Sequence, residues 1–155
     1  MGDLYKEILK YIKIRARSSG EVKLFLKERG VLPNNIDQYI IKLEEDALLN
    51  DSKFCENRIY YRLQGKHWGK LRIQTELLLL GVEKSLIQSE LDKIPLDLWQ
   101  ESCTKLIRKK KFDKKIPTDI LKLKKKLLAG GHEESIIQKA FADLEIPSPQ
   151  YIEQI

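Results

Sequence analysis

The segments LLLLGVEKSLI at 77–87 and KLLAGGHEESII at 126–137 share one pattern, in which a leucine-rich stretch ends at glycine and a short apolar run follows. A shift of 50 residues carries Leu77 to Leu127, Gly81 to Gly131 and Ile87 to Ile137. A shift of 51 residues relates the first third of the chain to the second. It carries Ser18 to Gly69, Glu21 to Arg72, Val22 to Ile73, Leu26 to Leu77 and Gly30 to Gly81. A register held over three copies indicates an internal repeat.

Each copy has the pattern of three helices. In the first copy, Ser18 and Glu21 form a capping box that starts the second helix, and Gly30 ends it. Pro33 then opens the third helix. In the third copy, the first helix should span about 96–111. The sequence therefore predicts an all-α fold of three tandem three-helix repeats in an elongated, curved array. We place the repeats at 1–46, 47–94 and 95–146, with 147–155 as a tail. Gly30, Gly81 and the pair Gly130-Gly131 should lie at equivalent helix ends.

Composition agrees with this fold class. Of the 155 residues, 34% are charged and 42% are apolar, a mixture that suits amphipathic helices. No apolar stretch approaches the roughly 20 residues of a membrane span, and the first residues have no signal-peptide core, so we expect a cytoplasmic protein. Cys55 and Cys103 lie at similar points of the second and third copies. We interpret them as packing residues, with redox sensing as the alternative, and expect neither a disulfide nor a metal site.

Positive charge is concentrated in one region. Residues 101–131 contain eleven Lys or Arg and three acidic residues, a net charge of +8, so the remainder carries −2 of the total +6. The densest part is RKKKFDKK at 108–115, and a second lysine cluster, KLKKK, follows at 122–126. Such runs contact phosphates without reading base sequence, but they also occur as solvated helix ends. Both interpretations stay open for this region.

A smaller basic set lies in the second copy. Arg58, Arg62 and Lys66 are spaced i, i+4, i+8 and should share one helix face, with no acid between Arg58 and Arg72. This face could contact an anionic partner or simply be solvated. Trp68 could anchor in a partner pocket or cover a junction between helices. Tyr60 and Tyr61 are adjacent, so at least one should be buried.

Two stretches resemble the RecX family. RARSSGEVKLFLKERG at 15–30 resembles that family's first helix-to-helix junction. The more specific match is LLNDSKFCENRIYYRLQGKHWGKLRIQTELLLLGV at 48–82, with its Asn-Asp, basic helix, Gly-x-x-Arg-Ile and Gly-Val. Cys55, where the family usually has Ala, and Gly131-His132, where the third copy often has Gly-Phe, depart from the pattern.

The resemblance implies a regulator that binds the RecA–DNA filament and restrains its ATP hydrolysis, strand exchange and co-protease activity. The alternatives are a nonspecific DNA-binding helical protein and a helical-repeat scaffold for another partner. The sequence has no catalytic motif, so we expect no enzyme and no cofactor, and we expect a monomer.

Two sets of candidate residues follow from this interpretation. The candidates for filament contact are Arg15, Arg17, Arg58, Arg62, Lys66, Trp68, Lys70 and Arg72. The candidates for contact with DNA or another polyanion are Arg108, Lys109, Lys110, Lys111, Lys114, Lys115, Lys122 and Lys125. Arg15 and Arg17 could equally pair with local acids.

Overall fold

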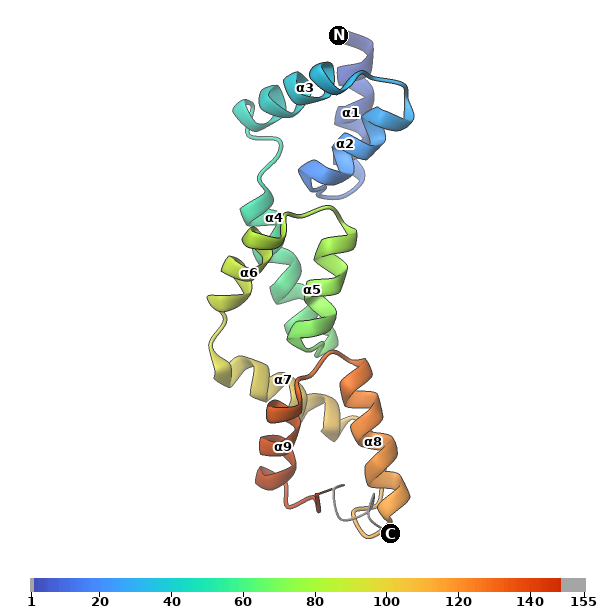
Figure 1. Ribbon diagram of the computed structural model, residues 1–155, viewed down its shortest axis with the longest axis vertical. Coiled ribbons are helices and arrows are strands. Elements are labelled where there is room, and N and C mark those ends of the chain that lie inside the picture. The colour runs from blue at the N-terminus through green and yellow to red at the C-terminus, as the bar shows by residue number, and fades with distance from the viewer. Residues whose placement is uncertain (1, 149–155) are drawn as a thin grey trace. The chain divides into compact units, whose positions relative to one another are not determined.

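The structure is a computed structural model that describes residues 2–148, and Figure 1 shows that this part of the chain is helical. It contains nine α-helices and no strand: α1 (Gly2–Ile14), α2 (Ser19–Glu28), α3 (Pro33–Glu45), α4 (Asp51–Tyr60), α5 (Lys70–Leu79), α6 (Lys84–Asp92), α7 (Leu96–Arg108), α8 (Pro117–Ala129) and α9 (Glu134–Asp143). A π-helical turn, η1 (Tyr61–Gly65), continues α4. The all-α prediction is confirmed. Residues 149–155 of the expected tail lie outside the described residues.

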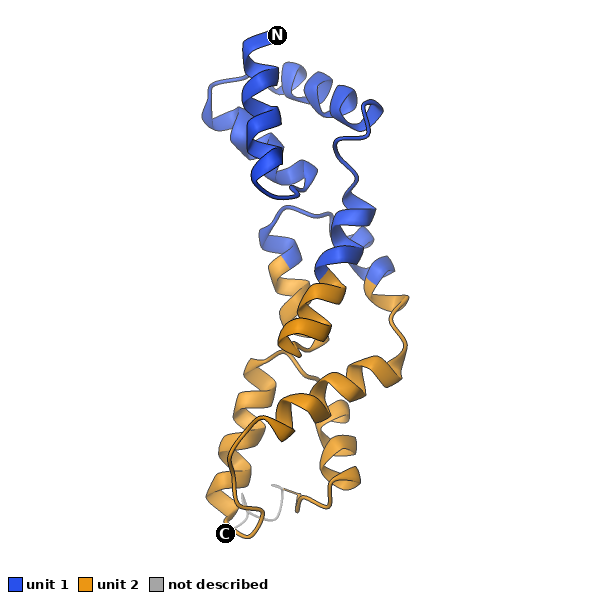
Figure 2. Cartoon of the chain, turned by 180° about the vertical axis from the view of Figure 1, so that it is seen from behind, with its two compact units in different colours: residues 1–58, 77–90 blue, residues 59–76, 91–155 orange. Residues whose placement is uncertain are grey.

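Contacts divide the chain into two compact units (Figure 2). Unit 1 consists of residues 1–58 and 77–90, and unit 2 of residues 59–76 and 91–155. The division passes through α4, α5 and α6, so the middle three helices contribute residues to both units. The three repeat boundaries stay a prediction, as does the curvature of the array.

Three glycines end three helices in the same way. Gly30, Gly81 and Gly131 have φ angles of 78°, 81° and 89°, which glycine adopts without the penalty of a Cβ. Each sits in the same pair of hydrogen bonds after α2, α5 or α8. The glycine N–H bonds to the carbonyl three residues earlier, and the next N–H bonds to the carbonyl five residues before it. The equivalence predicted from the repeat is therefore confirmed.

The start of α2 is fixed by the predicted capping box. The Ser18 side chain accepts from the Glu21 N–H at 3.1 Å, and the Glu21 side chain accepts from the Ser18 N–H at 3.1 Å. The fully buried Ser18 hydroxyl also donates to the Leu80 carbonyl, beside Gly81. One serine thus caps its own helix and ties it to the end of α5 within unit 1.

Glycines allow the two backbones to approach closely where the start of α2 meets the end of α5, a contact that we call the junction. A Cβ on Gly20 would lie 2.7 Å from the Cα of Gly81, inside the distance that two carbon atoms tolerate. The packing behind it is apolar: Ile8, Val22, Leu26 and Leu43 are fully buried in the same core. Burial of each such side chain stabilises the fold by roughly 1.5–3 kcal/mol.

Unit 2 repeats the junction 51 residues later. Gly69 N–H donates to the Gly130 carbonyl at 2.8 Å, and Leu71 N–H donates to the Gly131 carbonyl at 3.0 Å. A Cβ on Gly69 would overlap backbone atoms of Gly131 and His132. Gly30 has the same backbone conformation as Gly131, yet a Cβ there would meet nothing within 4 Å among the described residues. The start of a second helix therefore docks on Gly81 and on Gly131 but not on Gly30.

Two local expectations were wrong. Tyr60 and Tyr61 are 36% and 60% exposed, so neither is buried. Ile59 and Leu63, spaced i, i+4, fill the buried positions of this segment, so the two tyrosines between them point away from the core. The predicted helix over 96–111 ends at Arg108, so the basic run that follows is largely a loop.

Candidate partner-binding surfaces

Arg58, Arg62 and Lys66 differ in their surroundings, and the shared face expected from their spacing stays a prediction. The spacing assumes α-helical winding up to Lys66, whereas residues 61–65 wind as a π-helix. Arg58, in unit 1, lies over the Phe54 ring at 5.5 Å. Lys66 is exposed, and Arg62 is partly buried. The three cations therefore have three different environments.

Arg62 belongs to a cluster that we call the Trp68 cluster, formed by Arg62, Trp68, Arg72 and Glu76 in unit 2. The guanidinium groups of Arg62 and Arg72 lie 4.3 and 3.9 Å from the Trp68 ring centroid. Arg62 Nε also bonds to the Glu76 carboxylate at 2.9 Å, with both side chains about one fifth exposed. Cation–π contacts and a partly desolvated ion pair hold both arginines in defined positions.

The equivalent positions of the first copy form a second cluster with exchanged roles. The shift of 51 carries Tyr11 to Arg62, Arg17 to Trp68, Glu21 to Arg72 and Phe25 to Glu76. In this Tyr11 cluster, Arg17 lies 3.9 Å above the Tyr11 ring, and Phe25 stacks on Tyr11 at 4.3 Å. Aromatic and cationic residues have changed places, while the contacts between the positions are kept.

Arg15 and Arg17 precede α2, and both pair with Glu21. Arg15 makes two hydrogen bonds to the Glu21 carboxylate, one of them 3.2 Å long. Arg17 Nη1 lies 3.6 Å from the same carboxylate. The local pairing that the sequence left open is therefore present for both arginines. Lys70, also selected from the sequence, lies 3.8 Å from Asp92.

Two buried histidines meet beside the junction of unit 2. His132 Nε2 lies 2.9 Å from the His67 carbonyl oxygen, and His132 is only 1% exposed. Burial lowers the pKa of His132, and burial together with the positive charges of Lys109 and Lys105 lowers the pKa of His67. Both histidines therefore favour the neutral form, which suits packing residues better than cation sites.

Neither cysteine forms a disulfide within the described residues, and both are fully buried. Burial raises the pKa of the Cys103 thiol to about 12, so the reactive thiolate is suppressed. The packing interpretation of Cys55 and Cys103 fits their burial. Among the described residues, no group of three or more His, Cys, Asp or Glu could hold a metal ion.

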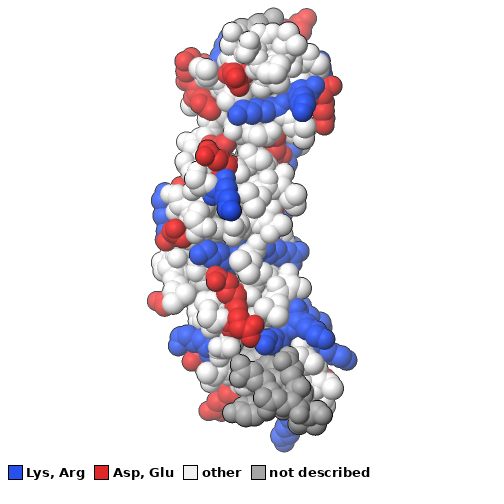
Figure 3. Space-filling view, viewed as in Figure 1, with Lys and Arg blue, Asp and Glu red and all other residues white. Residues whose placement is uncertain are grey.

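The basic residues between 108 and 126 line a loop and one face of α8 in unit 2. Figure 3 shows Lys and Arg gathered over α8. All eight residues of the predicted polyanion set are exposed except Lys110, which is partly buried. Sequence reasoning omitted Lys126, which is exposed and lies one helical turn beyond Lys122. The i, i+4 spacing of these two lysines could have indicated it.

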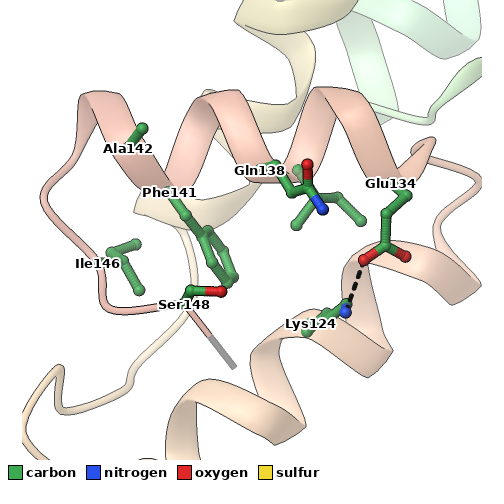
Figure 4. A pocket seen from close by; sticks show the side chains of 8 residues that line it. Lys124, Glu134, Gln138, Phe141, Ala142, Ile146 and Ser148 are labelled. Carbon is green, nitrogen blue, oxygen red and sulfur yellow. Dashed lines mark ion pairs between the residues drawn. The ribbon is translucent and has the colours of Figure 1, made fainter. Parts of the chain in front are cut away.

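A hollow of unit 2 lies between α8 and α9, with a volume of about 330 Å³ (Figure 4). Its apolar lining includes Ile137, Phe141 and Ile146, and Lys124 pairs with Glu134 at 2.7 Å across one side. The acid and the base of the lining neutralise each other. This arrangement offers neither a general acid–base pair nor a phosphate site.

Comparison with known proteins relates these features to one family. Residues 50–91, which include the Trp68 cluster, match the model of the second three-helix domain of RecX. The chain is 29% identical over 150 residues to the regulatory protein RecX of Streptococcus agalactiae serotype V, covering 94% of this chain and 57% of that protein. It is 30% identical over 142 residues to the RecX protein of Streptococcus mutans, covering 89% and 54%. The chain is thus similar to RecX proteins over most of its length.

Solved structures agree in fold. The crystal structure of RecX from Lactobacillus salivarius superposes with a TM-score of 0.80 at 21% identity, covering 92% of this chain and 95% of that one. A second crystal structure of a regulatory protein RecX gives 0.76 at 18% identity, covering 90% and 71%. This chain spans about half the length of the curated relatives it matches. No helix within residues 2–148 has the length and apolar character needed to cross a membrane.

Proposed function

We propose that this chain acts as a RecX protein, which binds the RecA–DNA filament and lowers its ATP hydrolysis, strand exchange and co-protease activity. The observation that carries the proposal is the match of residues 50–91 to the second three-helix domain of a family whose members are named regulatory proteins. This region also contains the two arginines held over Trp68.

The contact surface would combine fixed and mobile cations. Arg62 and Arg72 are held by Trp68 and Glu76, so their guanidinium groups lose little conformational entropy on binding a carboxylate or phosphate. Lys66 is exposed nearby in the chain and adds a flexible charge. Such a surface fits the anionic face of a protein–DNA assembly better than an apolar groove.

Sedimentation with a filament tests this surface. The recombinase is assembled on single-stranded DNA with a slowly hydrolysed ATP analogue, and the bound fraction of this chain is measured. Lys66→Glu should weaken binding, because it reverses an exposed charge while leaving the packing that supports the fold in place. Lys84→Glu is the matched control, since Lys84 is equally exposed at the start of α6. Equal binding by both variants, or no binding by the wild type, contradicts the proposal.

The arginines give a second comparison. Replacing Arg58 and Arg62 together with alanine should reduce inhibition of the recombinase more than binding to bare DNA. Circular dichroism must accompany this variant, because Arg62 also packs on Trp68 and pairs with Glu76.

Direct binding to DNA is a second candidate function. It is favoured by the net charge of +8 within residues 101–131, nearly all of whose basic side chains are exposed. Binding of a labelled oligonucleotide without any recombinase distinguishes it from the first.

A further inference from the structure

A small pocket lies between the loop at 109–116 and α8 in unit 2, with a volume of about 60 Å³. Four of the residues that line it are lysines, two from the loop and two from the helix. The lining consists of Lys110, Lys111, Phe112, Asp119, Lys122, Leu123 and Lys126. Basic residues that are far apart in the sequence are thus gathered around one small hollow.

Backbone hydrogen bonds fix the loop that carries the first two lysines. Asp113 N–H donates to the Asp119 carboxylate at 3.0 Å, which ties the loop to the first turn of α8. The Asp113 carboxylate in turn accepts from Lys115 N–H at 2.9 Å. The single acid of the pocket lining is therefore used to hold the loop, and one of its oxygens is already occupied.

The neighbouring lysines of this segment have other contacts or lie outside the pocket. Lys114 Nζ donates to the Leu144 carbonyl at 2.9 Å. Lys124 pairs with Glu134 on α9 at 2.7 Å. Lys122 and Lys126, which are spaced i, i+4, lie on the α8 face that borders the pocket. The structure thus distinguishes the four lysines that line the pocket from the other lysines of this segment, which the sequence alone does not distinguish.

Four like charges around a small hollow repel one another in the free protein. A pair of like charges one helical turn apart already destabilises a helix by a few tenths of a kcal/mol. A bound anion would convert this repulsion into attraction. Lysine ammonium groups act as point charges, so they accept a phosphate in many orientations and read no sequence.

We propose that this pocket binds a phosphate of a nucleic-acid backbone, with Phe112 beside it for stacking by an unpaired base. Phe112 is half-buried in the lining and Leu123 is buried, so both supply apolar surface next to the four cations. An aromatic ring beside a positive groove is the arrangement that proteins use for single strands. The carboxylates of an acidic peptide would gain nothing from the ring, so the pocket favours single-stranded nucleic acid.

Two variants with the same reduction in charge test the pocket. The pocket variant carries Lys110→Gln, Lys122→Gln and Lys126→Gln. The control carries Lys109→Gln, Lys115→Gln and Lys125→Gln, three exposed lysines of the same segment that do not line the pocket. Each variant has three fewer positive charges than the wild type. Binding is measured by fluorescence anisotropy with a labelled oligothymidylate of about 20 nucleotides, and folding by circular dichroism.

The pocket variant should bind the oligonucleotide about tenfold more weakly than the control. Its plot of log K against log salt should also be shallower by about 0.7 for each phosphate that the variant no longer neutralises. Equal weakening in both variants would mean diffuse attraction, and no binding by the wild type would mean no such site. A labelled polyglutamate peptide is the third probe. If the substitutions in the pocket weaken peptide binding more than oligonucleotide binding, the partner is an acidic protein segment and the assignment to nucleic acid is wrong.

The assay contains no recombinase, so it does not depend on the proposed filament regulation. Failure here leaves that proposal intact, and failure of filament binding leaves the pocket intact.

Discussion

Replacing Gly69 with alanine probes the junction that recurs in both units. At an unstrained position, Gly→Ala stabilises a protein by about 0.4–1 kcal/mol, because the unfolded chain has less conformational freedom. Gly69 has no left-handed φ, so its backbone would tolerate a side chain. Its Cβ, however, would overlap backbone atoms of Gly131 and His132. These atoms cannot rotate away as a flexible side chain could, so the junction must open.

The expected destabilisation follows from the packing and the hydrogen bonds of the junction. Overpacking costs about 1–3 kcal/mol. The two junction hydrogen bonds, at 2.8 and 3.0 Å, contribute about 0.5–1.5 kcal/mol each. After the unfolded-state gain is subtracted, Gly69→Ala should lower the free energy of unfolding by about 1–6 kcal/mol. For a chain of this length, a decrease near 3 kcal/mol lowers the melting temperature by roughly 6–12 °C.

Gly65→Ala is the matched control. A Cβ at Gly65 meets nothing within 4 Å, and the residue lies only four positions earlier in the same copy. Thermal and urea unfolding are followed by circular dichroism for both variants. If Gly69→Ala is as stable as Gly65→Ala, the close approach at Gly131 does not hold unit 2 together, and the junction as described is wrong.

Four further substitutions test the helix ends and the buried polar groups. Gly30→Ala should destabilise the protein by about 1–2 kcal/mol because Gly30 has a φ of 78°. Ala47→Gly should instead stabilise it by up to about 1 kcal/mol, since Ala47 has a φ of 58°. The midpoints of urea unfolding measure both changes, and a change of the same sign in both variants would contradict this prediction. Ser18→Ala should cost about 1–3 kcal/mol, because it removes the cap of α2 and leaves the Leu80 carbonyl without that donor, and an unchanged urea midpoint would refute it. Burial holds the pKa of His132 below its ordinary 6.5, so the unfolded chain binds more protons below that pH. The free energy of unfolding should accordingly be highest above pH 6.5 and fall as the pH drops below it. His132→Gln should reduce the difference between the urea midpoints at about pH 7.5 and about pH 5.5. If that difference is not reduced, the pH dependence of stability comes from other groups.

The helix ends could be predicted because their signals are local. The capping box of Ser18 and Glu21 and the glycines that end α2, α5 and α8 involve only residues within about one helical turn. Because the pattern repeats, the same glycine position occurs three times in the sequence. The close approach of Gly20 to Gly81 could not be predicted in this way. It joins residues 61 positions apart, and a glycine at the start of a helix does not indicate which backbone it will meet.

The candidate surfaces were predicted less completely, for two physical reasons. The π-helical turn at Tyr61–Gly65 has no sequence signature, and it interrupts the regular spacing from which a shared face of Arg58, Arg62 and Lys66 was expected. The sequence also did not show which acidic residues of other helices would pair with the candidate residues. From the sequence, Arg62 has no acidic partner, but in the structure Glu76 of α5 pairs with it. From the sequence, Asp119 only lowers the net positive charge, but in the structure its carboxylate accepts a hydrogen bond that fixes the basic loop.

The central claim, regulation of the recombinase filament, is tested most directly by ATP hydrolysis. The rate of single-stranded-DNA-dependent hydrolysis by the cognate recombinase is measured while this chain is added up to stoichiometric amounts. We expect the rate to fall progressively, and Lys66→Glu to require more protein than Lys84→Glu for the same inhibition. An unchanged rate across all ratios, together with no sedimentation of the chain with the filament, would contradict the account.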